Sequence, residues 1–277
     1  MRVPFFISCS VLFLPNLCAQ RIVSLAPSLT EITCDLGLCD RLVGVTDFCT
    51  YPPQVRDIAK VGGYIDPNLE IVVAMKPDWV LALPEHQTAI AKLEHLGIRV
   101  ETLRNWSIED IHQTIGTLGR LLQREQEAQR LELALAARRE KFLRKREKPP
   151  SCLLVLGHEA ASETIKEVFV VGRNGFLNEI LYLAGGMNAY PKETPYFPKL
   201  SQETLLELDP DVIIALVPVD NLAREEMAKM LKTWQSVPQL RAVRNDNVHI
   251  VHAEHVLQAG PRYVDTLARI SVILDGL

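Results

Sequence analysis

The chain has 277 residues, of which 48% are hydrophobic and 23% are charged, and its formal net charge is -4. This composition is that of an ordinary soluble protein, and the length is sufficient for two domains. No long basic run occurs, so the sequence does not support binding to nucleic acid or to an anionic membrane surface.

The first nineteen residues differ from the rest of the chain. Arg2 supplies a positive charge, residues 5–14 are mostly apolar, and Leu17-Cys18-Ala19 precedes a candidate cleavage point. This pattern predicts a signal peptide over residues 1–19 and export to the periplasm. Cys18 leaves lipid anchoring as the alternative, although lipid-modified cysteines usually follow a small residue and Leu17 is large. No later stretch is long and apolar enough for a transmembrane helix.

Four cysteines lie beyond the predicted signal peptide. Cys34, Cys39 and Cys49 are close enough in sequence to pair in an oxidising compartment, and the sequence does not decide between the pairings. Cys152 lies in the apolar run CLLVLG and is expected as a buried thiol. No spacing of cysteines and histidines indicates a structural zinc site.

Residues 20–104 are predicted to form an N-terminal α/β lobe, because apolar runs alternate with helical patterns over short links. Ser28 is expected to cap the first helix, with Glu31 at the capping-box position. We expect strands at 21–26, 42–45 and 98–103, and helices at 28–36 and 85–96.

Residues 105–149 are predicted to be helical. Ser107 precedes apolar residues spaced three and four apart up to Leu122, which is typical of an amphipathic helix. Residues 123–148 contain no Gly or Pro and are rich in strong helix formers, and Pro149-Pro150 ends the run. A single long helix here predicts a rigid bridge, and a peripheral surface helix of one domain is the alternative.

The α/β pattern returns in residues 150–277, the predicted C-terminal lobe. We expect strands at 152–156, 168–171 and 247–251, and helices at 176–184, 221–231 and 261–274.

A stretch in the first half of the chain is repeated in the second half. NLEIVVAMKPDWVLA at 68–82 aligns without gaps with SQETLLELDPDVIIA at 201–215. Each copy predicts a short helix, a Pro-Asp turn and a strand buried on both faces. Glu70 and Glu203 fall in equivalent first turns, where a carboxylate complements the helix dipole. The alternative is that the pair marks a symmetric docking surface, one carboxylate on each lobe.

Two lobes joined by one rod leave a cleft between them. A loop bearing aromatic residues precedes each repeat copy, with Tyr51 and Tyr64 in the first half and Tyr190, Tyr196 and Phe197 in the second. Aromatics beside a cleft suit a large, flat, partly apolar ligand.

Motifs for catalysis are missing from the sequence: it has no GxSxG, P-loop, GxGxxG or HExxH. We therefore expect a protein that is not an enzyme and uses no cofactor. His86, His158 and His255 each follow a predicted strand, so they could converge on a metal or a haem iron. Solvated loop histidines are the favoured alternative, and no metal site is predicted.

Six stretches carry a resemblance to one family. They are RIVSLAPSLTEI, LVGVTDFCTYPPQV, VGGYIDPNLEIVVAMKPDWVLA, GRNGFLNEILYLAGGMNAY, FPKLSQETLLELDPDVII and GPRYVDTL. In them the chain resembles the rigid, helical-backbone class of periplasmic substrate-binding proteins of ABC importers, nearest the cobalamin-binding members. The resemblance implies an α/β fold with two Rossmann-like lobes, a single long bridging helix and a ligand cleft between the lobes.

The resemblance also implies roles for individual residues. Glu70 and Glu203 match the carboxylates that meet arginines on the two permease copies. Leu83 stands where a further cleft tryptophan is expected. The residues that match ligand-binding positions are Tyr51, Tyr64, Phe169 and Phe197, together with Glu254 in place of a family Asp.

The function that we expect is capture of a corrinoid by a monomeric binding protein, which delivers it to a permease dimer with its ATPase. The alternatives are an iron-siderophore or haem binder of the same class, a binder of bare metal ions, and a secreted α/β enzyme. An enzyme would show turnover, whereas a binder shows saturable, stoichiometric uptake.

Overall fold

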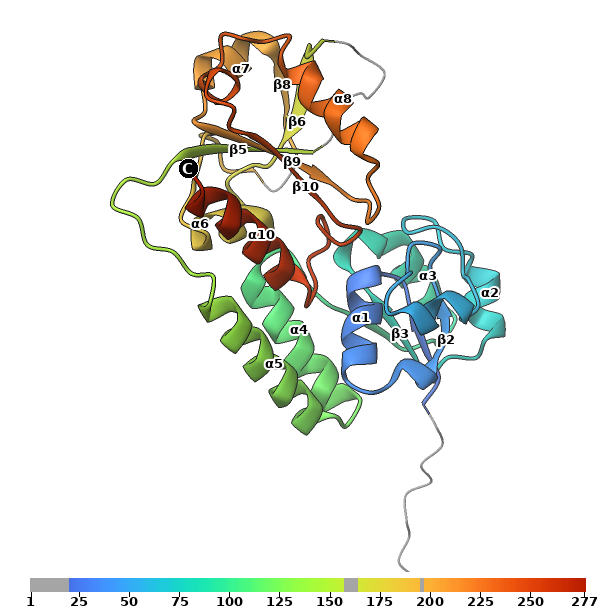
Figure 1. Ribbon diagram of the computed structural model, residues 1–277. Coiled ribbons are helices and arrows are strands. Elements are labelled where there is room, and N and C mark those ends of the chain that lie inside the picture. The colour runs from blue at the N-terminus through green and yellow to red at the C-terminus, as the bar shows by residue number, and fades with distance from the viewer. Residues whose placement is uncertain (1–19, 157–163, 195–196) are drawn as a thin grey trace, which may run out of the picture.

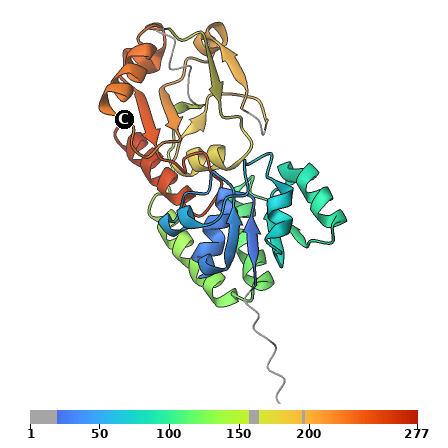
Figure 2. The ribbon, with the colours of Figure 1, turned by 90° about the vertical axis from the view of Figure 1, so that its right-hand side faces the viewer.

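The computed structural model describes residues 20–156, 164–194 and 197–277. The described strands form two separate sheets, which define an N-terminal lobe (β1 to β4 with α1 to α3) and a C-terminal lobe (β5 to β10 with α6 to α10). The C-terminal lobe lies above the N-terminal lobe in Figures 1 and 2. The predicted signal peptide lies outside the described residues.

The N-terminal lobe is built on a parallel sheet with the strand order β2-β1-β3-β4. Its strands are short and mostly buried, as expected for a parallel sheet that is covered on both faces. The strands are β1 (Ile22–Ser24), β2 (Leu42–Val45), β3 (Trp79–Ala82) and β4 (Val100–Thr102), and the helices are α1 (Pro27–Asp35), α2 (Leu69–Ala74) and α3 (Gln87–His95).

The C-terminal lobe has a mixed sheet with the order β10-β9-β5-β6-β8, and β7 pairs with β5. Among the described strands of this sheet, β6 runs opposite to the others and pairs antiparallel with both β5 and β8. The strands are β5 (Ser151–Leu156), β6 (Glu167–Val170), β7 (Met187–Asn188), β8 (Lys199–Ser201), β9 (Val212–Val217) and β10 (Val248–His252). The helices are α6 (Phe176–Leu183), α7 (Gln202–Leu208), α8 (Arg224–Trp234), α9 (Arg241–Arg244) and α10 (Tyr263–Asp275).

The two repeat copies fold alike, as predicted. Each forms a short helix (α2 or α7) and a buried strand (β3 or β9). The residue before each repeat proline has a positive φ, 47° in the first copy and 36° in the second. The side chain of Asp78 accepts from the backbone N–H of Arg21 at 2.8 Å, and that of Asp211 accepts from Ser151 at 2.9 Å. Each repeat aspartate therefore fixes the start of the strand beside its own.

The helix predicted over residues 123–148 forms only over Glu125–Glu140, as α5, so its predicted extent is wrong. Two antiparallel helices, α4 (Ile108–Leu121) and α5 (Glu125–Glu140), lead from one lobe to the other, with a break at Gln123, where φ is 58°. Residues 141–150 are not helical. The Arg144 side chain binds Asp275, and its backbone N–H binds the Leu183 carbonyl. These tertiary contacts outweigh the local helix propensity, which is a weak preference.

The lobes share one apolar core at their junction. It includes Ile32 of α1, Ile115 of α4, Leu154 of β5 and Leu267 of α10, all of them buried. Helix α4 contacts both lobes, because it packs on α1 and donates the Ile108 N–H to a C-terminal-lobe carboxylate. Figure 1 shows α4 and α5 side by side below α10. A packed core of this kind resists hinge motion.

A disulfide joins Cys34 at the end of α1 to Cys39. Cys49 and Cys152 are free and buried, so the expectation of a buried thiol at Cys152 is confirmed. In the part of the chain that the structure describes, no helix has both the length and the apolar character needed to cross a bilayer.

Candidate functional site

A cavity of about 1160 Å³ lies where the two lobes meet. Its wall comes from loops that follow β1, β2, β3, β4, β6, β9 and β10 and from the segments before α2 and β8. Most of these loops leave the carboxyl ends of strands, where ligands bind in open α/β sheets. The volume slightly exceeds the usual range for a small-molecule site, so the cavity suits a large ligand.

The cavity wall is strongly aromatic. Phe48, Trp106 and Phe197 expose 59%, 48% and 46% of their surface, and Tyr64 and Phe176 complete the set. Exposed aromatics that gather in a concave site are typical of ligand pockets, because each offers a large flat contact area. Sequence reasoning missed Phe48, Trp106 and Phe176, although the first two follow β2 and β4 and so had the strand-end signal.

Three of the five predicted ligand-binding residues line this cavity and two do not. Tyr64, Phe197 and Glu254 belong to its wall. Phe169 lies on β6, where Val168 and Val170 are buried and the alternate residues face out, so its ring points away from the core toward Lys199. Tyr51 lies under the Arg262 guanidinium, with the guanidinium carbon 3.9 Å from the ring centroid.

Tyr64 is held from two sides. Its hydroxyl donates to the Glu85 carboxylate at 2.7 Å, and its ring meets that of His86 edge-on at 4.9 Å. Burial, with the Glu85 carboxylate as a second cause, raises the pKa of the Tyr64 phenol well above its ordinary value. The phenol therefore stays neutral and presents a fixed ring to the cavity.

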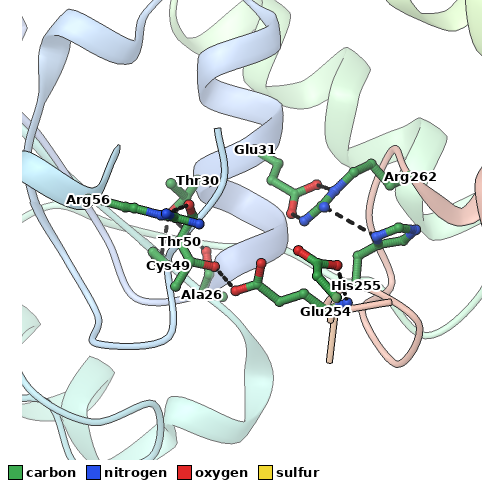
Figure 3. A network of polar contacts seen from close by, with 10 residues as sticks. Ala26, Thr30, Glu31, Cys49, Thr50, Arg56, Glu254, His255 and Arg262 are labelled. Carbon is green, nitrogen blue, oxygen red and sulfur yellow. Dashed lines mark hydrogen bonds and ion pairs between the residues drawn. The ribbon is translucent and has the colours of Figure 1, made fainter. Parts of the chain in front are cut away.

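A polar network joins the lobes beside the cavity (Figure 3). Arg262, just before α10, donates to both carboxylate oxygens of Glu31 on α1, through Nε at 3.0 Å and through Nη2. The Arg262 Nη1 lies 3.1 Å from His255 Nδ1. A second contact runs from the Thr50 hydroxyl to the Glu254 carboxylate. Two carboxylates, one on each lobe, thus connect the lobes at this edge.

The capping box predicted at the start of α1 is wrong. The helix begins at Pro27, one residue early, and its N-cap is Ala26, which has no side-chain cap. Ser28 lies inside the helix and accepts a hydrogen bond from Asn105. Proline suits the first helical position because its missing N–H has no partner there anyway. The Glu31 side chain is therefore left to bind Arg262.

Two of the three histidines that follow predicted strands are buried, contrary to the favoured expectation of solvated side chains. His86 and His255 are only 1% and 8% exposed. His86 Nδ1 accepts from the Leu83 N–H at 3.0 Å. In the described ranges no three His, Cys, Asp or Glu side chains gather in a metal-binding group. His158 lies outside the described residues.

His255 is expected to make the protein less stable in acid. Burial, with the Arg262 charge as a second cause, lowers its pKa from 6.5 to about 4. Because Arg262 can only donate, His255 Nδ1 must accept, and a protonated ring has no acceptor. Between pH about 6.5 and 4 the unfolded chain binds a proton that the folded chain does not, so the free energy of unfolding falls as the pH falls.

Melting temperatures from pH 7 to 4 test this expectation. The variant His255→Gln should lose less stability than the parent over this range, while His95→Gln, at an exposed histidine of α3, should follow the parent. Part of the acid sensitivity should remain, because burial also lowers the pKa of His86 and of His112. An unchanged pH dependence in His255→Gln would contradict the assignment.

Glu70 and Glu203 are both exposed and both lie in first turns, of α2 and α7. The Asn68 side chain caps α2 and the Ser201 side chain caps α7, so the same local device positions each carboxylate. Helices α2 and α7, which carry them, lie in different lobes (Figure 1), and neither glutamate lines the cavity.

The fold and the cleft are those of a two-lobed solute-binding protein. Residues 22–254 match the family model described as periplasmic binding protein, and the chain belongs to this family. An ABC transporter substrate-binding lipoprotein of Bacillus subtilis is 28% identical, over 91% of this chain and 79% of its own length. A vitamin B12-binding protein of Vibrio cholerae is 28% identical, over 99% and 98%. The crystal structure of a periplasmic heme binding protein from Pseudomonas aeruginosa has a TM-score of 0.74 and 28% identity, with 92% of each chain covered.

Proposed function

We propose that this chain is the substrate-binding component of an ABC importer and that its ligand is a corrinoid. The observation that carries the proposal is the large interlobe cavity with its wall of five aromatic side chains, which fits a broad macrocycle. The vitamin B12-binding relative, which aligns over nearly the whole chain, supports the corrinoid. The chain acts as an exported monomer, with residues 1–19 as its signal peptide.

Haem or an iron-siderophore complex is the second candidate, favoured by the likeness to the heme binding protein. Absorbance spectra of the purified protein separate the candidates. Cyanocobalamin, haemin and a ferric siderophore are titrated in turn, and the expected result is a saturable, one-to-one spectral change with cyanocobalamin. A one-to-one change with haemin or the siderophore alone would overturn the corrinoid proposal and leave the binding role standing.

The aromatic wall gives a sharper test. Phe197→Ala should weaken corrinoid binding by about two- to twelve-fold, because an aromatic contact contributes about 0.5 to 1.5 kcal/mol beyond area burial. Phe169→Ala is the matched control, since Phe169 is in the same lobe and is 48% exposed but does not line the cavity. Titration calorimetry gives both affinities. Equal affinities in the two variants would place the ligand elsewhere.

The proposed partner is a permease dimer, which the chain meets through Glu70 and Glu203. Equivalent carboxylates on two related lobes fit the twofold symmetry of a homodimer.

An exported binding protein is either free or attached to the membrane by a lipid. A lipid anchor at Cys18 has support from the Bacillus subtilis relative, which is named a lipoprotein, while the large Leu17 favours a free, cleaved protein.

A further inference from the structure

The wall of the interlobe cavity carries acidic groups without basic ones. Asp47, Asp66, Glu85 and Glu254 line it, and the described lining residues include no Lys, Arg or His. Within the described ranges none of these four carboxylates forms an ion pair. Glu85 accepts from the Tyr64 hydroxyl and Glu254 from the Thr50 hydroxyl, and neither hydroxyl cancels a charge.

Three basic side chains near the wall direct hydrogen-bond donors at groups other than its four carboxylates. Arg262 donates two hydrogen bonds to Glu31, and its guanidinium covers the Tyr51 ring. Lys60 donates to the Cys49 carbonyl at 2.9 Å, and Arg56 donates to the Thr50 carbonyl at 3.2 Å. The Arg262 charge therefore offsets that of Glu31 first and Glu254 only at longer range. The carbonyls do not cancel the charges of Lys60 and Arg56, but neither side chain lines the cavity, so the described wall itself is negative.

A ligand buried in a negative field must carry compensating groups. Haem brings two propionates, and a corrinoid with its nucleotide loop brings a phosphate; each would lie next to unpaired carboxylates, and like charges at an interface oppose binding. A corrin ring without the nucleotide loop carries amide N–H donors around its rim and a net positive charge at cobalt. Carboxylates accept from amide N–H groups and attract the cobalt charge.

Building on the corrinoid-binding function proposed above, we infer that this cleft selects cationic corrinoids that lack the nucleotide phosphate, of the cobinamide type. Specificity comes from the four wall carboxylates, which disfavour every anionic ligand that fits the volume. The aromatic side chains supply contact area for any flat macrocycle, so they do not discriminate between these ligands.

The probes are aquacyanocobinamide, which is a monocation, cyanocobalamin, which is neutral overall, and haemin. The variant Asp47→Asn/Asp66→Asn removes two wall charges at side chains with no ion pair among the described residues. One carboxylate about 8 Å from the cobalt charge should change affinity by about five-fold at an intermediate dielectric constant. The double variant should therefore weaken cobinamide by roughly ten-fold or more, leave cyanocobalamin within about two-fold and strengthen haemin.

Glu94→Gln/Glu225→Gln is the control for total charge, because both side chains are exposed and lie outside the cavity wall. This control should leave all three affinities unchanged. Tighter binding of cobinamide than of cyanocobalamin, weakened by added salt and by the wall variant, supports the inference. Binding of both corrinoids with no response to the wall variant overturns the inference and leaves the corrinoid function intact. Binding of neither corrinoid overturns the proposed function.

Discussion

Arg262→Ala is expected to lower the free energy of unfolding by about 3 to 5 kcal/mol, the usual cost of removing one partner of a buried ion pair. Its partner Glu31 is 3% exposed, and Arg262 itself is 16% exposed. Without the guanidinium, the Glu31 carboxylate would stay inside the lobe junction with neither a counter-charge nor the two hydrogen bonds that Arg262 donates. Urea unfolding followed by circular dichroism measures the change.

A surface pair provides the matched control. Arg138 on α5 pairs with Asp265 on α10, and these side chains are 48% and 35% exposed. Arg138→Ala should cost less than about 1 kcal/mol, because exposed ion pairs contribute little. The double variant Glu31→Met/Arg262→Met should recover much of the loss, since it removes both buried charges. A loss in Arg262→Ala no larger than in Arg138→Ala would show that the network does not hold the lobes.

The sequence predicted the elements well wherever the signal was local. Each repeat copy forms the short helix that it predicts, with Asn68 or Ser201 as the cap, and Ser107 begins α4 with a capping box. Apolar runs such as VIIAL became buried strands, because a run of this kind is stable only between two covering layers. The two-lobed α/β fold follows from these elements and from their repetition.

Errors occurred where distant contacts compete with local preference. Nothing near Arg144 in sequence shows that its side chain and backbone will bind Asp275 and Leu183, and these contacts end the predicted long helix early. The pairing of Glu31 with Arg262 spans 231 residues. The Ser-x-x-Glu pattern at Ser28 instead predicts a local hydrogen bond for Glu31, so the pairing with Arg262 was not predicted.

For the candidate site, the sequence indicates which loops lie at the cavity, whereas the direction of each side chain depends on distant contacts. Tyr64, Phe197 and Glu254, which the resemblance matches to ligand-binding positions, line the cavity, since each is on a loop whose position follows from the strand order. Phe169, whose direction depends on the β6 alternation, and Tyr51, whose ring Arg262 covers, do not line the cavity, and the ligand-binding roles of all five residues stay predictions. Side-chain direction depends on tertiary packing, which no motif records.

The double variant Glu70→Ala/Glu203→Ala is expected to bind corrinoid normally and to lose transport. Both carboxylates are exposed and outside the cavity wall, so neither ligand affinity nor folding should change. Docking would bury each carboxylate against a permease arginine, and losing one partner of such a pair costs about 2 to 5 kcal/mol. Two losses in one interface should reduce corrinoid-stimulated ATP hydrolysis by the reconstituted importer to its basal level.

The matched control removes two first-turn carboxylates from a different helix. Glu225 and Glu226 are exposed carboxylates in the first turn of α8, which lies on a different side of the C-terminal lobe from α7 (Figure 1). Glu225→Ala/Glu226→Ala removes the same charge and the same helix-dipole complement, so full stimulation is expected. Each single variant, Glu70→Ala or Glu203→Ala, should retain partial activity because the other lobe still docks. Full stimulation by the Glu70→Ala/Glu203→Ala protein would reduce both residues to dipole complements, and the repeat would then record common ancestry of the lobes alone.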